Sequence, residues 1–109
     1  MRILLDECVP RRFRHQLPEH EVRTAPEMGW ASFKNGALLS AASGKFDVLL
    51  TTDQRLSYQQ NVSAFAIAVI VLVAGRNKLE FLLPLVPELR KVLGEVKPGE
   101  VRRVGVSFW

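Results

Sequence analysis

Two apolar runs of the same shape, each followed by acidic residues, most strongly constrain what this chain can fold into. Residues 3–5 precede Asp6 and Glu7, and residues 48–52 precede Asp53. Short continuous apolar runs are typical of parallel strands that are buried on both faces. In an open α/β sheet, ligands bind beyond the carboxyl ends of such strands. The two runs therefore predict one crevice that contains Asp6, Glu7 and Asp53.

The rest of the chain alternates strand and helix patterns. Pro10 suits the first turn of a helix, Pro18 ends that helix, and Asn35 can cap another. Apolar periodicity predicts strands over residues 2–5, 21–24, 47–51, 66–73 and 101–108, and helices over 10–17, 36–43, 54–60 and 79–93, with a loop over 26–34. This order predicts an α/β fold with a mostly parallel central sheet and helices on both faces.

Length and composition predict one soluble cytoplasmic domain over residues 1–109. A chain of 109 residues matches the usual size of a single core, and its one cysteine excludes an internal disulfide. The first residues lack the pattern of a secretory signal, and the longest apolar stretch, residues 62–75, is too short to cross a bilayer. We therefore expect no membrane association.

The acidic residues at the strand ends are the first candidates for chemistry. Carboxylates held close together repel each other, so they usually bind a metal ion or share a proton. Mg²⁺ and Mn²⁺ prefer such hard oxygen ligands, which makes Asp6 and Asp53 candidate ligands. A structural interpretation also stays open, in which Asp6 accepts hydrogen bonds from loop N–H groups and Asp53 caps a helix.

Basic residues cluster close to these acids in a chain whose net charge is +4. Arg11, Arg12 and Arg14 follow the first acidic pair, while Arg55 and Gln59 follow Asp53. Arginines beside a carboxylate site suit a phosphate backbone that approaches a metal, which makes these five residues candidate RNA contacts. A solvated helix face is an equally open interpretation of the first cluster.

Several segments, in order, resemble a known family. Residues 4–10, Leu-Leu-Asp-Glu-Cys-Val-Pro, look like the LLDEnlP opening of small bacterial PIN-like proteins, and residues 48–53 are similar to their VLvTrD segment. Segments within residues 27–36, 58–61, 82–87 and 97–101 resemble one subgroup of that family.

The resemblance implies a PIN-like three-layer α/β/α fold and a ribonuclease that depends on Mg²⁺ or Mn²⁺. It implies that Asp6 and Asp53 are metal ligands and catalytic residues, with Glu7 as a helper. Related proteins often act as toxins beside a small antitoxin protein, which implies an antitoxin partner.

The chain departs from the family pattern at the start of the central helix. The family tends to place an acid there, whereas this chain has Asn35, Gly36 and Ala37. Asn35 can still offer an oxygen as a third metal ligand, but Ala37 cannot, and Glu27 lies upstream as a substitute. The departure supports a second interpretation, a catalytically degenerate PIN-like module that binds RNA or a protein partner.

A third interpretation, a phosphoacceptor receiver domain, fails further along the chain. Such domains also place acids after the first and third strands. Residues 73–75 lack the hydroxyl side chain that their switch needs, and Lys97 precedes the last strand instead of following it.

The last six residues, 104–109, are mostly apolar and end in Phe108 and Trp109. An aromatic pair of this kind would be exposed on an isolated monomer, and large exposed apolar patches tend to mark interfaces. The sequence therefore favours a homodimer, with back-folding of the two rings onto their own core as the alternative.

Overall fold

The structure is a computed structural model that describes residues 1–55 and 61–105. Its strands are β1 (Arg2–Leu5), β2 (Glu21–Thr24), β3 (Val48–Thr51), β4 (Ala68–Val73) and β5 (Val101–Gly105). They form one sheet in the order β2-β1-β3-β4-β5, and every neighbouring pair is parallel. The predicted parallel α/β sheet is confirmed, and β1 and β2 have the predicted bounds.

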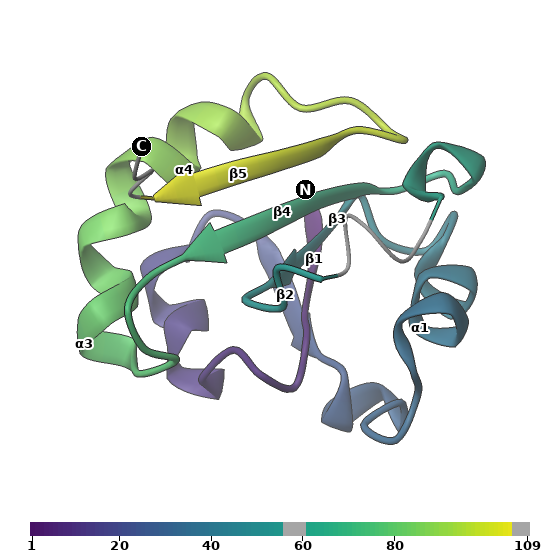
Figure 1. Ribbon diagram of the computed structural model, residues 1–109, viewed down its shortest axis with the longest axis horizontal. Coiled ribbons are helices and arrows are strands. Elements are labelled where there is room, and N and C mark those ends of the chain that lie inside the picture. The colour runs from purple at the N-terminus through teal and green to yellow at the C-terminus, as the bar shows by residue number, and fades with distance from the viewer. Residues whose placement is uncertain (56–60, 106–109) are drawn as a thin grey trace.

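Helices cover both faces of this sheet, as Figure 1 shows. The helix α1 (Asn35–Ala42) lies on one side, whereas α3 (Leu79–Leu82) and α4 (Val86–Leu93) lie on the other. The 3₁₀ helix η1 (Arg11–Gln16) packs on the same core as α3 and α4. This arrangement confirms the predicted three layers.

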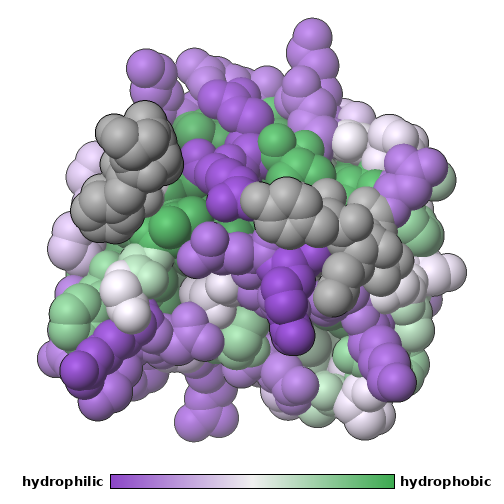
Figure 2. Space-filling view, viewed as in Figure 1, coloured by the Kyte–Doolittle hydropathy of each residue, from purple (hydrophilic) through white to green (hydrophobic). Residues whose placement is uncertain are grey.

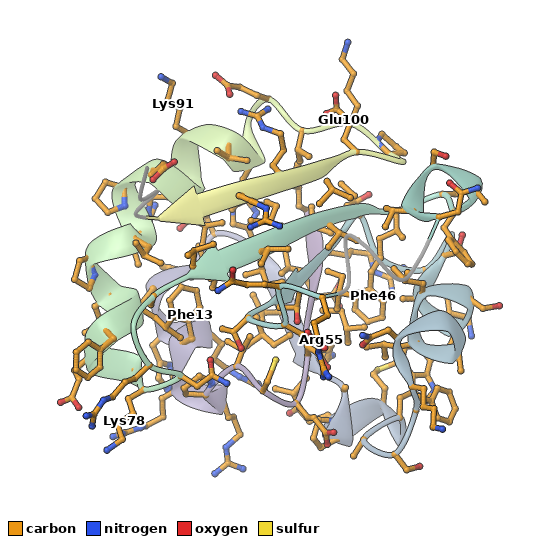
Figure 3. All side chains as sticks on the ribbon, in the orientation of Figure 1. Phe13, Phe46, Arg55, Lys78, Lys91 and Glu100 are labelled. Atoms are coloured by element: carbon orange, nitrogen blue, oxygen red, sulfur yellow. The ribbon has the colours of Figure 1, made fainter. Side chains whose placement is uncertain are left out.

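Each face of the sheet has its own apolar core, because successive side chains of a strand point to opposite faces. Along β1, Ile3 and Leu5 join the core beneath α3 and α4, while Leu4 joins the core beneath α1. Figure 3 shows Phe13 of the first core and Phe46 of the second on opposite sides of the view. The central strands β1, β3 and β4, which are buried along most of their length, therefore contribute side chains to both cores.

Two predicted helices differ from the structure, and proline chemistry explains the second difference. The helix predicted over 10–17 is the 3₁₀ helix η1, whose N–H of Phe13 bonds to the carbonyl of Pro10 at 2.9 Å. The helix predicted over 79–93 is divided into α3, η4 (Leu83–Leu85) and α4. Pro84 and Pro87 lack the N–H groups that a continuous helix needs there.

Smaller differences concern where elements begin. The helix α1 starts at Asn35 itself, with Lys34 as its cap, so the prediction that Asn35 caps the helix is wrong by one residue. The strand β4 starts at Ala68, since the N–H of Ala66 bonds to the hydroxyl of Ser43 at 2.8 Å. The predicted loop over 26–34 contains a short 3₁₀ helix, η2 (Pro26–Met28), and η3 (Val62–Ala64) precedes β4.

Some predictions fall outside the described residues. Most of the helix predicted over 54–60, including the candidate RNA contact Gln59, lies there, as do residues 106–109 with the aromatic pair behind the homodimer prediction. Within residues 1–55 and 61–105, no helix is long and apolar enough to cross a membrane.

The strand order fixes where a ligand can enter. The chain passes from β1 to β2 on one side and then returns to place β3 on the other side of β1. The order therefore reverses between β1 and β3, and doubly wound sheets bind ligands at the carboxyl ends of the strands at such a point. Asp6 follows β1 and Asp53 lies two residues beyond β3, so both belong to this edge.

Candidate functional site

A polar pocket of about 340 Å³ opens at the carboxyl ends of β1 and β3. We call it the carboxylate pocket. Its walls come from the ends of three strands, the start of α1 and the loop before it. The lining residues are Asp6, Glu7, Cys8, Phe33, Asn35, Thr52, Asp53, Arg55 and Asn77.

Asp6 forms the buried floor of this pocket, with 8% of the residue exposed. Its N–H bonds to the carbonyl of Leu50 at 2.9 Å, which ties it to β3. Oδ1 accepts the N–H of Glu7 at 2.9 Å, and Oδ2 accepts the hydroxyl of Thr51 at 2.8 Å. The carboxylate is therefore held in place by one backbone N–H and one strand hydroxyl, and each oxygen keeps a second lone pair for a ligand.

Thr51 connects the two aspartates. Its fully buried hydroxyl donates to Asp6 and accepts the N–H of Asp53 at 3.0 Å. It also lies 3.5 Å from the sulfur of Cys8, which accepts the N–H of Thr52 at 3.4 Å. Because the hydroxyl proton of Thr51 is donated to Asp6, it is not available to a phosphate. The side chain of Thr51 therefore positions the two aspartates.

Asp53 is held by Asn35 and Arg55. Oδ2 accepts the side-chain amide of Asn35 at 3.2 Å, while Oδ1 accepts the backbone N–H of Arg55 at 3.0 Å and its Nε at 3.2 Å. Partial burial raises the pKa of Asp53, but the hydrogen bonds from Arg55 and Asn35 outweigh it and lower the pKa below its ordinary value. Asp53 is therefore a carboxylate at neutral pH.

Five predicted site residues meet in this pocket: Asp6, Glu7, Asn35, Asp53 and Arg55. Glu7 is exposed on its wall, and Arg55 has a side chain that is 77% exposed. Figure 3 shows Arg55 between Phe46 and Phe13, at the level of the central sheet. The crevice predicted at the two strand ends is therefore present as this pocket.

The oxygen donors of the pocket suit a hard cation. Asp6, Asp53 and Asn35 come from three separate segments and offer carboxylate and amide oxygens, the ligands that Mg²⁺ and Mn²⁺ prefer. Among residues 1–55 and 61–105, no three His, Cys, Asp or Glu side chains are grouped to hold a metal. A cation here would therefore rely on two carboxylates, the amide and water.

Glu27 is not part of this pocket. Its carboxylate accepts the guanidinium of Arg14 and, at 2.8 Å, the N–H of Thr24. Hydrogen bonds from Arg14 and Thr24 lower the pKa of Glu27. Glu27 therefore ties η1 to the end of β2, and Arg14 is occupied by this ion pair.

Ala37 is exposed on α1.

A second pocket, of about 510 Å³, adjoins the first. We call it the basic pocket; its lining residues are Pro10, Arg12, Asn77, Lys78, Leu79, Glu80 and Leu83. Asn77 lines both pockets, so they are neighbours. Arg12 is the predicted RNA contact that lies here, and Arg11 is exposed beside it in the sequence.

Four lining residues are not among these five predicted site residues: Cys8, Phe33, Thr52 and Asn77. Asn77 follows the strand β4, so the rule that ligands bind beyond the carboxyl ends of parallel strands also applies to it. Cys8 directly follows the acidic pair. From sequence, Phe33 beside Lys34 could either stack on a base or be buried against the core, and its place in the pocket depends on how the loop before α1 packs.

Lys97 lies at the opposite edge of the sheet. The turn that contains it bonds through the N–H of Gly99 to the carbonyl of Ile67, directly before β4, at 2.9 Å. The amino ends of the strands are therefore at Lys97, and the carboxyl ends at Asp6. This position agrees with the argument against a receiver domain.

Comparisons with protein-family models, curated proteins and solved structures find no significant match to this chain. The PIN-like resemblance therefore stays a prediction that depends on the quoted motifs. What the chain shows by itself is a parallel α/β sheet with two aspartates at its switch point.

Proposed function

We propose that this protein hydrolyses RNA phosphodiester bonds with the help of Mg²⁺ or Mn²⁺ in the carboxylate pocket. One observation carries the proposal: Asp6 and Asp53, from the ends of neighbouring strands, line one pocket and share Thr51 as a hydrogen-bond partner. The motif resemblance to PIN-like proteins supports the same reaction.

Each residue has a part in this proposal. Asp6 and Asp53 would hold the cation, with the amide oxygen of Asn35 turned toward it. When bound, the cation would act as a Lewis acid that activates water and stabilises the charge that develops on the phosphate group. Glu7, exposed on the wall, would accept a proton from water, and Arg55 would bind a phosphate oxygen once released from Asp53.

The adjoining basic pocket supports a polyanionic substrate. Arg12 and Lys78 place positive charge next to the carboxylate pocket, with Asn77 between the two. A phosphate backbone that entered the carboxylate pocket would continue past Asn77 toward these cations. This arrangement favours a polynucleotide over a small phosphate ester.

The test replaces each aspartate by asparagine. Asp6→Asn and Asp53→Asn should abolish Mn²⁺ binding, measured by calorimetry, and RNA cleavage, measured on gels, while circular dichroism shows a folded protein. Asp47→Asn is the matched control, because Asp47 accepts the N–H of Arg2 at the amino edge of the sheet, away from the pocket. Wild-type protein that binds no metal and cleaves no RNA with Mg²⁺ or Mn²⁺ contradicts the proposal.

A second candidate function is a module that binds RNA or a protein without chemistry. The ion pair of Arg55 with Asp53, at 3.2 Å, favours it, because the pair neutralises a carboxylate that the cation needs. Exposed Ala37, in place of an acid, favours it as well. This candidate predicts RNA binding without metal that survives Asp53→Asn; binding that needs both metal and Asp53 contradicts it.

The biological setting that we propose follows from the resemblance alone. Related PIN-like proteins often act as toxins, so a small antitoxin protein is the partner to look for. Co-expression with the product of a neighbouring small reading frame, followed by co-purification, tests for such a partner.

A further inference from the structure

Phe33 is an exposed aromatic residue on the wall of the carboxylate pocket. The residue is 39% exposed, whereas Phe13 and Phe46 are almost fully buried. Apolar residues at the rim of a polar pocket cost hydration free energy unless a ligand covers them. Phe33 therefore offers an apolar surface to a ligand that enters the pocket.

The ring of Phe33 is held in place from one side. It stacks on Trp30 with a centroid distance of 6.1 Å and an interplanar angle of 17°. Trp30 in turn meets the buried ring of Phe46 edge-on, at 6.2 Å and 80°. The N–H of Phe33 bonds to the carbonyl of Trp30 at 2.9 Å, which fixes the turn. An aromatic surface fixed in this way loses little conformational entropy when a ligand binds.

Cations lie near Phe33, beside the carboxylates of the same pocket. Lys34 follows it and is exposed, and Arg55 lines the same pocket. Lys45 lies with Nζ 5.6 Å from the ring centre of Trp30. Flat aromatic surfaces among cations are the features by which proteins bind single-stranded nucleic acid.

We propose that Phe33 stacks on an unpaired base of the RNA strand whose phosphate enters the carboxylate pocket. The inference rests on the proposed function and deepens it by naming the residue that would contact a base of the substrate. A base in a duplex is already stacked on its neighbours and cannot cover this ring without leaving the helix. Phe33 would therefore favour loops and single strands over duplexes.

The test measures binding of a fluorescent single-stranded oligouridylate and of an abasic oligomer of equal length, both in EDTA so that no cleavage occurs. Phe33→Ala should weaken binding of the oligouridylate between about 5-fold and 150-fold, the range for one stacked base. Binding of the abasic oligomer, which offers phosphates without bases, should not change. Phe33→Tyr should keep most of the affinity.

Phe81→Ala is the matched control. Phe81 is 42% exposed on α3, where it lies beside Arg76, and it lines neither pocket. Equal losses for Phe33→Ala and Phe81→Ala, equal binding of the two oligomers by wild type, or no binding of either would each overturn the inference.

The two proposals fail in different ways. If the protein shows no metal-dependent cleavage but binds RNA bases through Phe33, the nuclease proposal is contradicted and the stacking proposal is supported. If Phe33→Ala leaves metal-dependent cleavage unaffected at all RNA concentrations, the nuclease proposal is supported and the stacking proposal is contradicted.

Discussion

Thr51 shows how much of the site depends on a single hydroxyl. It donates to the carboxylate of Asp6 and accepts the N–H of Asp53, and it is completely buried. A buried polar group that loses its partner costs more than the hydrogen bond contributed. The side chain therefore couples the geometry of the pocket to the stability of the fold.

We expect Thr51→Val to lower the free energy of unfolding by about 1–3 kcal/mol, because it leaves the N–H of Asp53 without this partner. Urea unfolding followed by circular dichroism measures the change. Thr51→Ser is the control, since it keeps the hydroxyl and loses only a methyl group. A serine variant as strongly affected as the valine variant would show that packing matters, not the hydrogen bonds.

Glu27 gives the fold a dependence on pH. Its pKa lies below the ordinary value of 4.5, so ionised Glu27 stabilises the folded state above that pH. The stabilisation disappears as pH falls through the folded-state pKa.

We expect Glu27→Gln to lower the free energy of unfolding at neutral pH by about 0.2–1 kcal/mol, the usual range for an exposed ion pair. Urea unfolding at neutral and acidic pH should show that the difference from wild type shrinks in acid. Glu80→Gln is the control, because Glu80 is exposed on α3. A difference for Glu27→Gln that stays constant with pH would contradict the role of the carboxylate.

At the scale of elements, the sequence predicts those strands and helices whose formation depends on hydrophobic patterning. The apolar runs of β1, β3 and β4 are unambiguous because these strands are buried on both faces. Helix type is harder, because η1 and the break at Pro84 depend on local hydrogen bonding. In the site, the positions of Asp6 and Asp53 could be predicted from the ends of the strands. The position of Phe33 and the hydrogen bond of Asn35 to Asp53 depend on tertiary packing.

The end of β5 depends on the absence of a side chain. Gly105 has a φ of 132°, and a Cβ added there would lie 2.0 Å from the carbonyl oxygen of Val73 on β4. We expect Gly105→Ala to cost more than about 1 kcal/mol in the free energy of unfolding, because the strands must separate locally. Thermal unfolding measures the loss.

Gly94 provides the matched control for this substitution. It ends α4 with a φ of −77°, and an added Cβ would lie at an ordinary 3.5 Å from the carbonyl oxygen of Lys91. Gly94→Ala should therefore be neutral or stabilise the fold by up to about 1 kcal/mol. Equal effects of the two substitutions would show that the close approach at Gly105 is not what matters.

At the scale of the molecule, the charge pattern favours a polyanion. The net charge is +4, and Figure 2 shows hydrophilic side chains over most of the face it displays, with apolar residues in smaller patches. In Figure 3, Lys78 of the basic pocket lies at the lower left and Lys91 of α4 at the upper left. The two lysines therefore allow local and general electrostatic effects to be separated.

We expect Lys78→Ala and Arg12→Ala each to reduce the salt dependence of RNA binding. Each lost phosphate contact should lower the slope of log affinity against log salt concentration by about 0.7, the value for single strands. Fluorescence anisotropy over a salt series measures the slope. Lys91→Ala is the control, and a slope change equal to that of Lys78→Ala would place the RNA elsewhere on the surface.

The two cores of unequal size have a consequence for the pocket. Asp6 and Asp53 follow strands that both cores support, whereas Asn35 and the turn of Phe33 belong to the layer over the smaller core. Local opening favours the segment with less buried apolar surface. The two sides of the pocket therefore depend on different cores, and a substitution that destabilises the smaller core would displace Phe33 and Asn35 before it displaces the two aspartates.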